Sequence, residues 1–266
     1  MYKLVALDMD GTLLNENQKI NDRVKKAISE ARKRGTKIIL SSGRGFRGIE
    51  KYVRELGLDE LVISLNGAVV TDASGDNTVF SIHMEPEVTR RIIELQQEYD
   101  VFSIYFEGLK MYVEELNDKA IYFSEFEGVK VIPVGNMLDF YTTQPIGKML
   151  MIGEYEKFLV FRERLLGELG QYINVTFSMP EFLEAYNINV SKGIILNKVA
   201  NYYGLKRDEV IAIGDGENDI SMIEYAGLGV AMGNAMEEVK KAADLITRAN
   251  AEDGVARVIE EYILNR

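Results

Sequence analysis

Short apolar runs alternate with amphipathic segments over about the first eighty residues of the chain. The runs at 3–7, 37–41 and 61–67 have the composition of buried strands, and the segments 21–35 and 46–57 show the 3.6-residue spacing of helices. Continuous apolar strands separated by helices are buried on both faces. The pattern therefore predicts a parallel sheet with helices on each side.

The first of these helices has clear predicted boundaries. Asn21 is a favourable N-cap residue, and Gly35 is a favourable residue at a helix end. At helical spacing, one apolar face is formed by Val24, Ala27, Ile28 and Ala31. We expect this face to be buried.

The same alternation returns after about residue 190, whereas the middle of the chain has a different pattern. From about Pro86, helices alternate with pairs of strand-like runs, such as 101–108 and 110–116 around a tight turn at Gly108. This mixture is typical of an antiparallel sheet with helices on one face. We expect the apolar side chains of this region to form its core, among them Tyr105, Phe106, Met111 and Tyr112.

Together these patterns predict an α/β protein with a Rossmann-like parallel-sheet core domain and an inserted α+β cap domain. The two ends of the chain, residues 1–82 and 188–266, form the predicted core, and residues 83–187 form the predicted cap. A chain of 266 residues is long enough for two such domains.

The composition removes several functional classes. The chain has no cysteine, which excludes thiolate catalysis and cysteine-bound metals, and its single histidine, His83, excludes sites built from two imidazoles. We expect a structural role for His83. A formal charge of −11 argues against a nucleic-acid partner. No stretch approaches the ~20 apolar residues that span a bilayer and the start lacks a secretory pattern, so we expect a cytoplasmic protein with no membrane partner.

Two acidic loops follow apolar strands. In "LVALDMDGTLL" the strand leads to Asp8 and Asp10, and in "IGDGENDISM" Asp215 follows a strand while Asn218 and Asp219 begin the next helix. The carboxyl ends of parallel strands form the ligand-binding edge of an open sheet, so these groups are expected to converge. Either loop alone also fits an ordinary Asp-Gly turn, but both together are improbable by chance.

Converging carboxylates repel one another unless a cation neutralises them. An oxygen-only ligand set without histidine or cysteine points to Mg²⁺ rather than to zinc. A magnesium ion held by few carboxylates keeps positions for water and for substrate phosphate. The expected substrate is therefore a small phosphate ester.

Four motifs stand in order along the chain: "DMDGT" at 8–12, "SSGR" at 41–44, "VSKG" at 190–193 and "GDGENDISM" at 214–222. With them, the chain resembles the haloacid dehalogenase superfamily of phosphotransferases, and within it the Cof-type sugar phosphatases that carry an α/β cap. The resemblance covers the whole length. It implies a magnesium-dependent phosphatase.

By this resemblance, Asp8 is the nucleophile that forms an aspartyl-phosphate intermediate, and Asp10 is the general acid and base. Ser42 and Lys192 are expected to contact the transferred phosphoryl group. The remaining substrate-binding residues implied by the family are Gly11, Gly43, Arg44 and Asn66. The implied metal ligands are Asp8, Asp10, Asp215, Asn218 and Asp219, with either Asn218 or Asp219 completing the set.

Some of these residues also fit purely structural roles. Ser42 and Asn66 also fit ordinary turns, and a lysine such as Lys192 at a helix start is usually solvated. A phosphomutase would keep every catalytic residue, and a non-catalytic phospho-receiver or phosphate-binding protein would also gather acidic groups around Mg²⁺. Hydrolysis is the preferred interpretation; the physiological ester, and whether the protein is a monomer or a small homo-oligomer, stay open.

Overall fold

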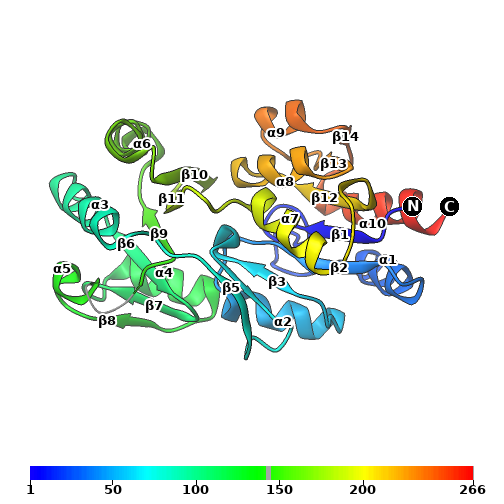
Figure 1. The fold of residues 1–266 in the computed structure, drawn as a ribbon, viewed down its shortest axis with the longest axis horizontal. Helices are drawn as coiled ribbons and strands as arrows, with labels where there is room; N and C mark the ends of the chain where they lie inside the picture. Colours follow the sequence, from blue (N-terminus) through cyan, green and yellow to red (C-terminus); the bar gives the residue numbers. More distant parts are fainter. Residues whose placement is uncertain (142–144, 266) are drawn as a thin grey trace.

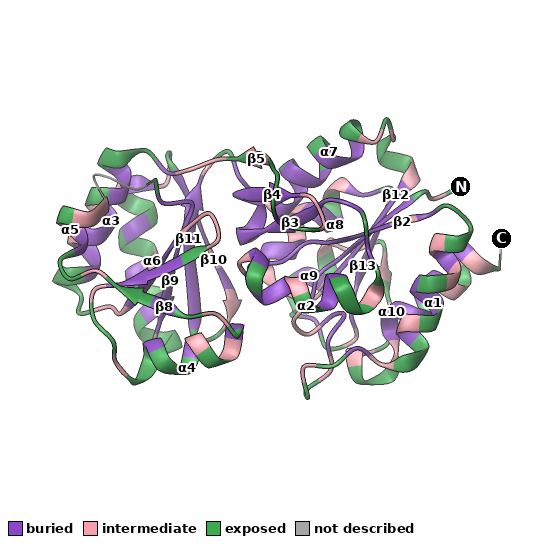
Figure 2. Ribbon diagram, turned by 90° about the horizontal axis from the view of Figure 1, so that it is seen from below, coloured by how far each residue is buried: buried purple, intermediate pink, exposed green. Residues whose placement is uncertain are grey.

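The computed structural model describes residues 1–141 and 145–265, which form two lobes, each built around a large sheet (Figure 1). We call them the core lobe, which contains both chain termini, and the cap lobe. Buried residues line the strands of both lobes, and the outward faces of the helices are exposed (Figure 2). Within the described residues, no helix is both long and apolar enough to cross a membrane.

The core sheet contains five parallel strands. Their order is β14 (Leu245–Ile246), β13 (Leu228–Ala231), β12 (Val210–Gly214), β1 (Leu4–Leu7) and β2 (Lys37–Leu40). The two central strands, β12 and β1, are buried along their whole length. This is the Rossmann-like core that the alternating pattern predicts, with both acidic loops leaving neighbouring strands.

Helices cover both faces of the core sheet. One face carries α1 (Asp22–Lys33), α2 (Phe46–Leu56), α9 (Glu237–Ala242) and α10 (Gly254–Ile259). The other face carries α7 (Lys192–Tyr202), and α8 (Ile220–Tyr225) contributes to both clusters. The predicted apolar face of α1 is confirmed, since all four of its residues are buried.

The predicted start of α1 at Asn21 is confirmed. Asn21 does occupy the N-cap position of α1, but its side chain accepts no hydrogen bond from the helix. Instead it accepts a hydrogen bond from Asn15 at 2.7 Å and donates one to Asp253 at 2.8 Å. These hydrogen bonds to Asn15 and Asp253 hold the Asn21 side chain away from the first turn of α1.

The predicted third strand does not extend the core sheet. Residues 62–64 form β3 (Val62–Ser64), which is joined to the core sheet by one bridge between Ser41 and Ile63. It pairs instead in an antiparallel sheet with β4 (Val69–Thr71) and β5 (Thr78–Ser81), two strands that the sequence pattern did not reveal. The hairpin with β4 and β5 satisfies the hydrogen bonds of β3.

The cap lobe is built on a six-stranded sheet. Its order is β10 (Ile173–Met179), β11 (Phe182–Asn187), β9 (Lys148–Ile152), β6 (Ser103–Glu107), β7 (Lys110–Val113) and β8 (Val131–Pro133). All pairs are antiparallel except β7 with β8, so the expected antiparallel sheet is confirmed apart from this one parallel pair. A connection through α4 (Asp118–Glu127) separates β7 from β8 and allows the parallel pairing.

Helices also lie on both faces of the cap sheet, whereas the sequence pattern placed them on one. The outer face packs against α3 (Pro86–Glu98), α5 (Met137–Phe140) and α6 (Tyr155–Leu169). The face toward the core lobe packs against α4 and against Leu65 and Val69. The strands are apolar on both sides, as Ile104 and Tyr105 show on opposite faces of β6. The predicted burial of Tyr105, Phe106, Met111 and Tyr112 is confirmed.

The chain crosses between the lobes at residues 82–84 and again at 187–190. The two crossings are joined by a hydrogen bond from the Asn187 side chain to the carbonyl oxygen of His83, at 2.8 Å. The His83 ring contacts the Ser81 hydroxyl at 3.0 Å and is half-buried. His83 therefore belongs to the junction of the lobes and not to the acidic loops.

Candidate active site

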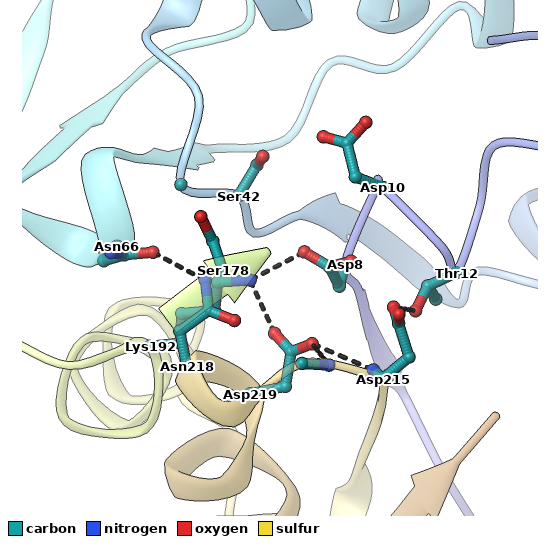
Figure 3. A network of polar contacts seen from close by, with 12 residues as sticks. Asp8, Asp10, Thr12, Ser42, Asn66, Ser178, Lys192, Asp215, Asn218 and Asp219 are labelled. Carbon is teal, nitrogen blue, oxygen red and sulfur yellow. Dashed lines mark hydrogen bonds and ion pairs between the residues drawn. The ribbon is translucent and has the colours of Figure 1, made fainter. Parts of the chain in front are cut away.

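Three carboxylates converge at the carboxyl edge of the core sheet. Asp8 follows β1, Asp215 follows β12, and Asp219 ends the short helix η4 (Glu217–Asp219). Each offers one oxygen within 4.8 Å of the others (Figure 3). Because β1 and β12 are neighbouring parallel strands, their following residues are brought together by the sheet itself.

Lys192, the first residue of α7, is fully buried among these carboxylates. Its ammonium group donates to Asp8 Oδ1 at 2.6 Å and to Asp219 Oδ1 at 2.5 Å. Burial alone would lower the pKa of Lys192, but Asp219 and Asp8 raise it above its usual value. The lysine is therefore charged, and the interpretation of a solvated helix-start lysine is wrong.

The carboxylates carry more negative charge than Lys192 neutralises. Three aspartates and one lysine sum to −2 when all are ionised. Burial and the neighbouring Asp219 raise the pKa of Asp8 well above its usual value, and the same two causes raise the pKa of Asp215 to about 7. A divalent cation would reduce the repulsion between these carboxylates, and the all-oxygen donor set fits Mg²⁺.

Asp215 is the least buried of the three aspartates. One of its oxygens accepts a hydrogen bond from Thr12 at 2.6 Å. Both oxygens of Asp219 are occupied, one by Lys192 and the other by the backbone N–H groups of Asp215 and Gly216 at 2.9 and 3.0 Å. Asp219 is therefore held as an anchor for Lys192 and for the loop, and Asp8 and Asp215 are the better placed metal ligands.

Gly11 has a steric reason to be glycine. Its φ is +80°, and a Cβ atom there would lie 2.1 Å from Asp215 Oδ2. A side chain would thus meet both backbone strain and a direct clash with the carboxylate. The glycine lets the Asp8–Thr12 loop lie against the second acidic loop.

Asp10 is placed differently from the other aspartates. Its carboxylate points away from Asp8 (Figure 3) and forms a bidentate ion pair with Arg44, at 2.7 and 2.6 Å. The Asp10 carboxylate is outside the cluster of possible metal ligands, so the structure does not bring it to the other expected ligands. Arg44, expected to bind substrate, is buried and turned toward Asp10.

Ser42, Asn66 and Asn218 lie on the loops around the carboxylates. The Ser42 hydroxyl accepts a hydrogen bond from the Arg44 backbone N–H at 3.1 Å, so this serine helps to shape its own loop. Asn218 donates its side-chain N–H to Asn66 at 3.0 Å. Asn66 has a positive φ of 57°, which is uncommon for a residue other than glycine. Asn218 thus supports Asn66 in this structure.

The cap lobe covers the site and contributes charged groups that were not among the predicted site residues. The pocket between the lobes has a volume of about 40 Å³ and is lined on the core side by Asp8, Asp10 and Ser42. On the cap side its polar lining includes Glu127, Lys148, Ser178 and Glu184. Lys148 and Glu184 stand in the apolar runs "KMLMI" and "FLEAY", where a charge at a buried strand position was the available signal.

Comparison with known proteins agrees with this arrangement. A sequence profile of the haloacid dehalogenase-like hydrolase family matches residues 5–259. The chain belongs to this family. The expected family and its α/β fold with a cap are confirmed, and the protein is an enzyme of the phosphatase class of haloacid dehalogenase hydrolases.

Individual relatives of this hydrolase span its full length. It is 33% identical over 264 residues to 5-amino-6-(5-phospho-D-ribitylamino)uracil phosphatase YcsE of Bacillus subtilis, covering 98% of this chain and 96% of the relative. A haloacid dehalogenase-like hydrolase from Bacteroides thetaiotaomicron has 34% identity and a TM-score of 0.85, with 98% and 99% coverage. A subclass IIB sugar phosphatase has 26% identity and a TM-score of 0.86, with 98% of both chains covered.

Proposed function

We propose that this hydrolase is a magnesium-dependent phosphatase of small phosphomonoesters that acts through an aspartyl-phosphate on Asp8. The observation that carries the proposal is the buried cluster in which Lys192 contacts Asp8 and Asp219 beside the less buried carboxylate of Asp215. The names of the relatives support a phosphorylated polyol or sugar as the substrate, since one is named for a ribitylamino phosphate and another as a sugar phosphatase.

In the first half-reaction an Asp8 carboxylate oxygen attacks phosphorus, and the bond from phosphorus to the leaving oxygen breaks. Lys192, already bound to Asp8, offsets charge on the transferred oxygens, and Ser42 lines the same pocket. Bound Mg²⁺, held by Asp8 and Asp215, would supply charge neutralisation between the carboxylates and the phosphate. Asp10 donates a proton to the leaving alkoxide.

In the second half-reaction, water attacks the phosphorus of the aspartyl-phosphate, and Asp10 accepts the proton that the water loses. Inorganic phosphate leaves and the Asp8 carboxylate is restored. In the structure, Arg44 holds Asp10 through both carboxylate oxygens. Asp10 must therefore rotate away from Arg44 to reach the leaving group, because its carboxylate points away from Asp8 (Figure 3).

We further propose that residues 83–187 move as a cap on residues 1–82 and 188–266. Ligand pockets of small molecules usually measure about 300–1,000 Å³, whereas the pocket here has about 40 Å³. A sugar phosphate does not fit this volume, so substrate entry requires the lobes to separate. The cytoplasmic location and the oligomeric state stay predictions.

The test is release of inorganic phosphate from sugar, sugar-alcohol, nucleotide and cofactor phosphates, with and without Mg²⁺, by the wild type and by Asp8→Asn. We expect magnesium-dependent release that falls at least about 10³-fold in the variant. A folded, magnesium-loaded wild type that releases phosphate from none of these esters contradicts the proposal. If the phosphoryl group instead reappears on a second position of the substrate, the enzyme is a phosphomutase.

A further inference from the structure

The cap face of the pocket contains an ion pair that the mechanism does not use. Lys148 on β9 and Glu184 on β11 have exposed fractions of 1% and 3%, and Lys148 donates to Glu184 Oε1 at 2.8 Å. Strand alternation places them on the same face of the cap sheet as Leu150, Phe182 and Tyr186. These three side chains belong to the hydrophobic cluster between the cap sheet and the core lobe. The two charges therefore interrupt an otherwise apolar surface.

Packing does not account for these charges. A buried ion pair contributes little net stability compared with apolar side chains of similar volume, because both charges lose their hydration. A second cap carboxylate, Glu127, lines the same pocket, and none of the described residues provides a hydrogen-bond partner for its Oε2 atom. The charged groups that the cap face offers to a ligand in the pocket are thus one ammonium group and two carboxyl groups.

Both members of the pair also reach across to the core lobe. Lys148 donates to the carbonyl oxygen of Gly43 at 2.5 Å, and Glu184 accepts a hydrogen bond from the Asn66 side chain. These contacts close the pocket. When the lobes separate to admit substrate, Lys148 loses an acceptor and Glu184 loses a donor. Water can satisfy both groups while the lobes are apart. An ester that excludes this water and lies between the lobes has to supply the replacement partners, since unsatisfied buried charges are costly.

We propose, on the basis of the proposed phosphatase function, that Lys148 and Glu184 bind the leaving group and select one that carries neighbouring hydroxyl groups. With the phosphate at Asp8 and Ser42, the leaving group lies toward the cap side of the pocket. A hydroxyl oxygen accepts from Lys148, and a neighbouring hydroxyl donates to Glu184. An alkyl chain satisfies neither group, and an anionic leaving group is repelled by Glu184.

The test compares esters of equal chain length with and without hydroxyl groups: ribitol 5-phosphate with n-pentyl phosphate, and glucose 6-phosphate with n-hexyl phosphate. Binding of each to magnesium-loaded Asp8→Asn is measured by calorimetry, with and without Glu184→Gln. We expect at least one hydroxylated ester to bind 10-fold or more tightly than its alkyl partner, and Glu184→Gln to remove most of this preference. In the enzyme with Asp8 intact, kcat/KM should likewise be higher for the hydroxylated ester than for its alkyl partner, and Glu184→Gln should reduce this difference.

A matched control is Glu154→Gln, which removes an exposed ion pair with Lys157 on the same lobe and should leave the preference unchanged. If Glu184→Gln does not fold, Ser178→Ala replaces it, because Ser178 donates to Glu184 Oε1 at 3.1 Å; we expect about a 3-fold loss of preference. Equal or undetectable binding of the paired esters, or a preference that survives the substitutions, overturns the inference. Selective binding without any phosphate release would instead overturn the proposed hydrolysis alone.

Discussion

The two faces of the pocket neutralise their charges in opposite ways. On the core face, Lys192 pairs with Asp8 and Asp219, and the cluster that these two form with Asp215 retains negative charge. On the cap face, Lys148 and Glu184 neutralise each other and are further satisfied by the core lobe. The negative charge of the core face is therefore neutralised only when a cation binds. Lys148 and Glu184, in contrast, keep all their hydrogen bonds only when the lobes are closed. In our proposal, this difference separates the groups that perform the chemistry from the surface that recognises the ester.

The largest expected effect comes from replacing the two buried lysines. Lys192→Met and Lys148→Met each leave buried carboxylates without their counter-charge, so each should lower the free energy of unfolding by about 3–5 kcal/mol. Lys192→Met should also reduce phosphate release by about 10³-fold. Urea denaturation with and without Mg²⁺ distinguishes the faces: Mg²⁺ should restore stability to Lys192→Met alone. Equal recovery of both variants would contradict the comparison.

A second effect should follow from adding a methyl group at two glycines. Gly11→Ala places Cβ against Asp215 and should weaken Mg²⁺ binding by about 10-fold or more, as measured by the magnesium dependence of activity. Gly108→Ala, in the β6–β7 turn at φ +53°, meets no atom within 4 Å, so its cost of about 1 kcal/mol is conformational. Unchanged magnesium affinity in Gly11→Ala would show that the core loops have room to move.

A third expected effect, confined to the cap face, depends on pH. Burial raises the pKa of Glu127 to about 7, although Arg44 and Lys148 oppose it. The folded state therefore binds the proton more tightly, and the resulting stability is present below about pH 4.5 and lost as pH rises through 7. Glu127→Gln does not titrate, so its stability relative to wild type should rise over this window by on the order of 3 kcal/mol. Thermal unfolding from pH 4.5 to 8 measures it.

Glu125→Gln is the control for that experiment, because Glu125 lies on the same helix with an exposed side chain. Its stability difference from wild type should stay flat over the same pH range. A flat profile for Glu127→Gln as well would mean that Glu127 stays ionised, held by Arg44.

Much of the core lobe follows from local sequence. The buried face of α1 and the strands β1, β2 and β12 are defined by apolar spacing within a few residues, and the two acidic loops follow from strand ends. The hairpin of β4 and β5 did not follow, because β5 is partly exposed and its apolar residues are few. Strands that short are specified by their partners rather than by their own pattern.

The candidate site shows the same limit. The approach of Asp8, Asp215 and Asp219 is implied by parallel neighbouring strands, but the pairing of Asp10 with Arg44 depends on a side-chain direction that spacing does not encode. The cap side of the pocket depends on contacts between the lobes. These arise from residues more than a hundred positions apart, as between Asn66 and Glu184.

The hydrogen bond between Asn187 and His83 ties together the two crossings between the lobes. Since short connections hold the cap beside the core, closure is an intramolecular event with a high effective concentration of one face for the other. Individually weak contacts across the pocket are then sufficient to close it. The rate of closing should not depend on protein concentration, and it should be set by how readily this junction bends.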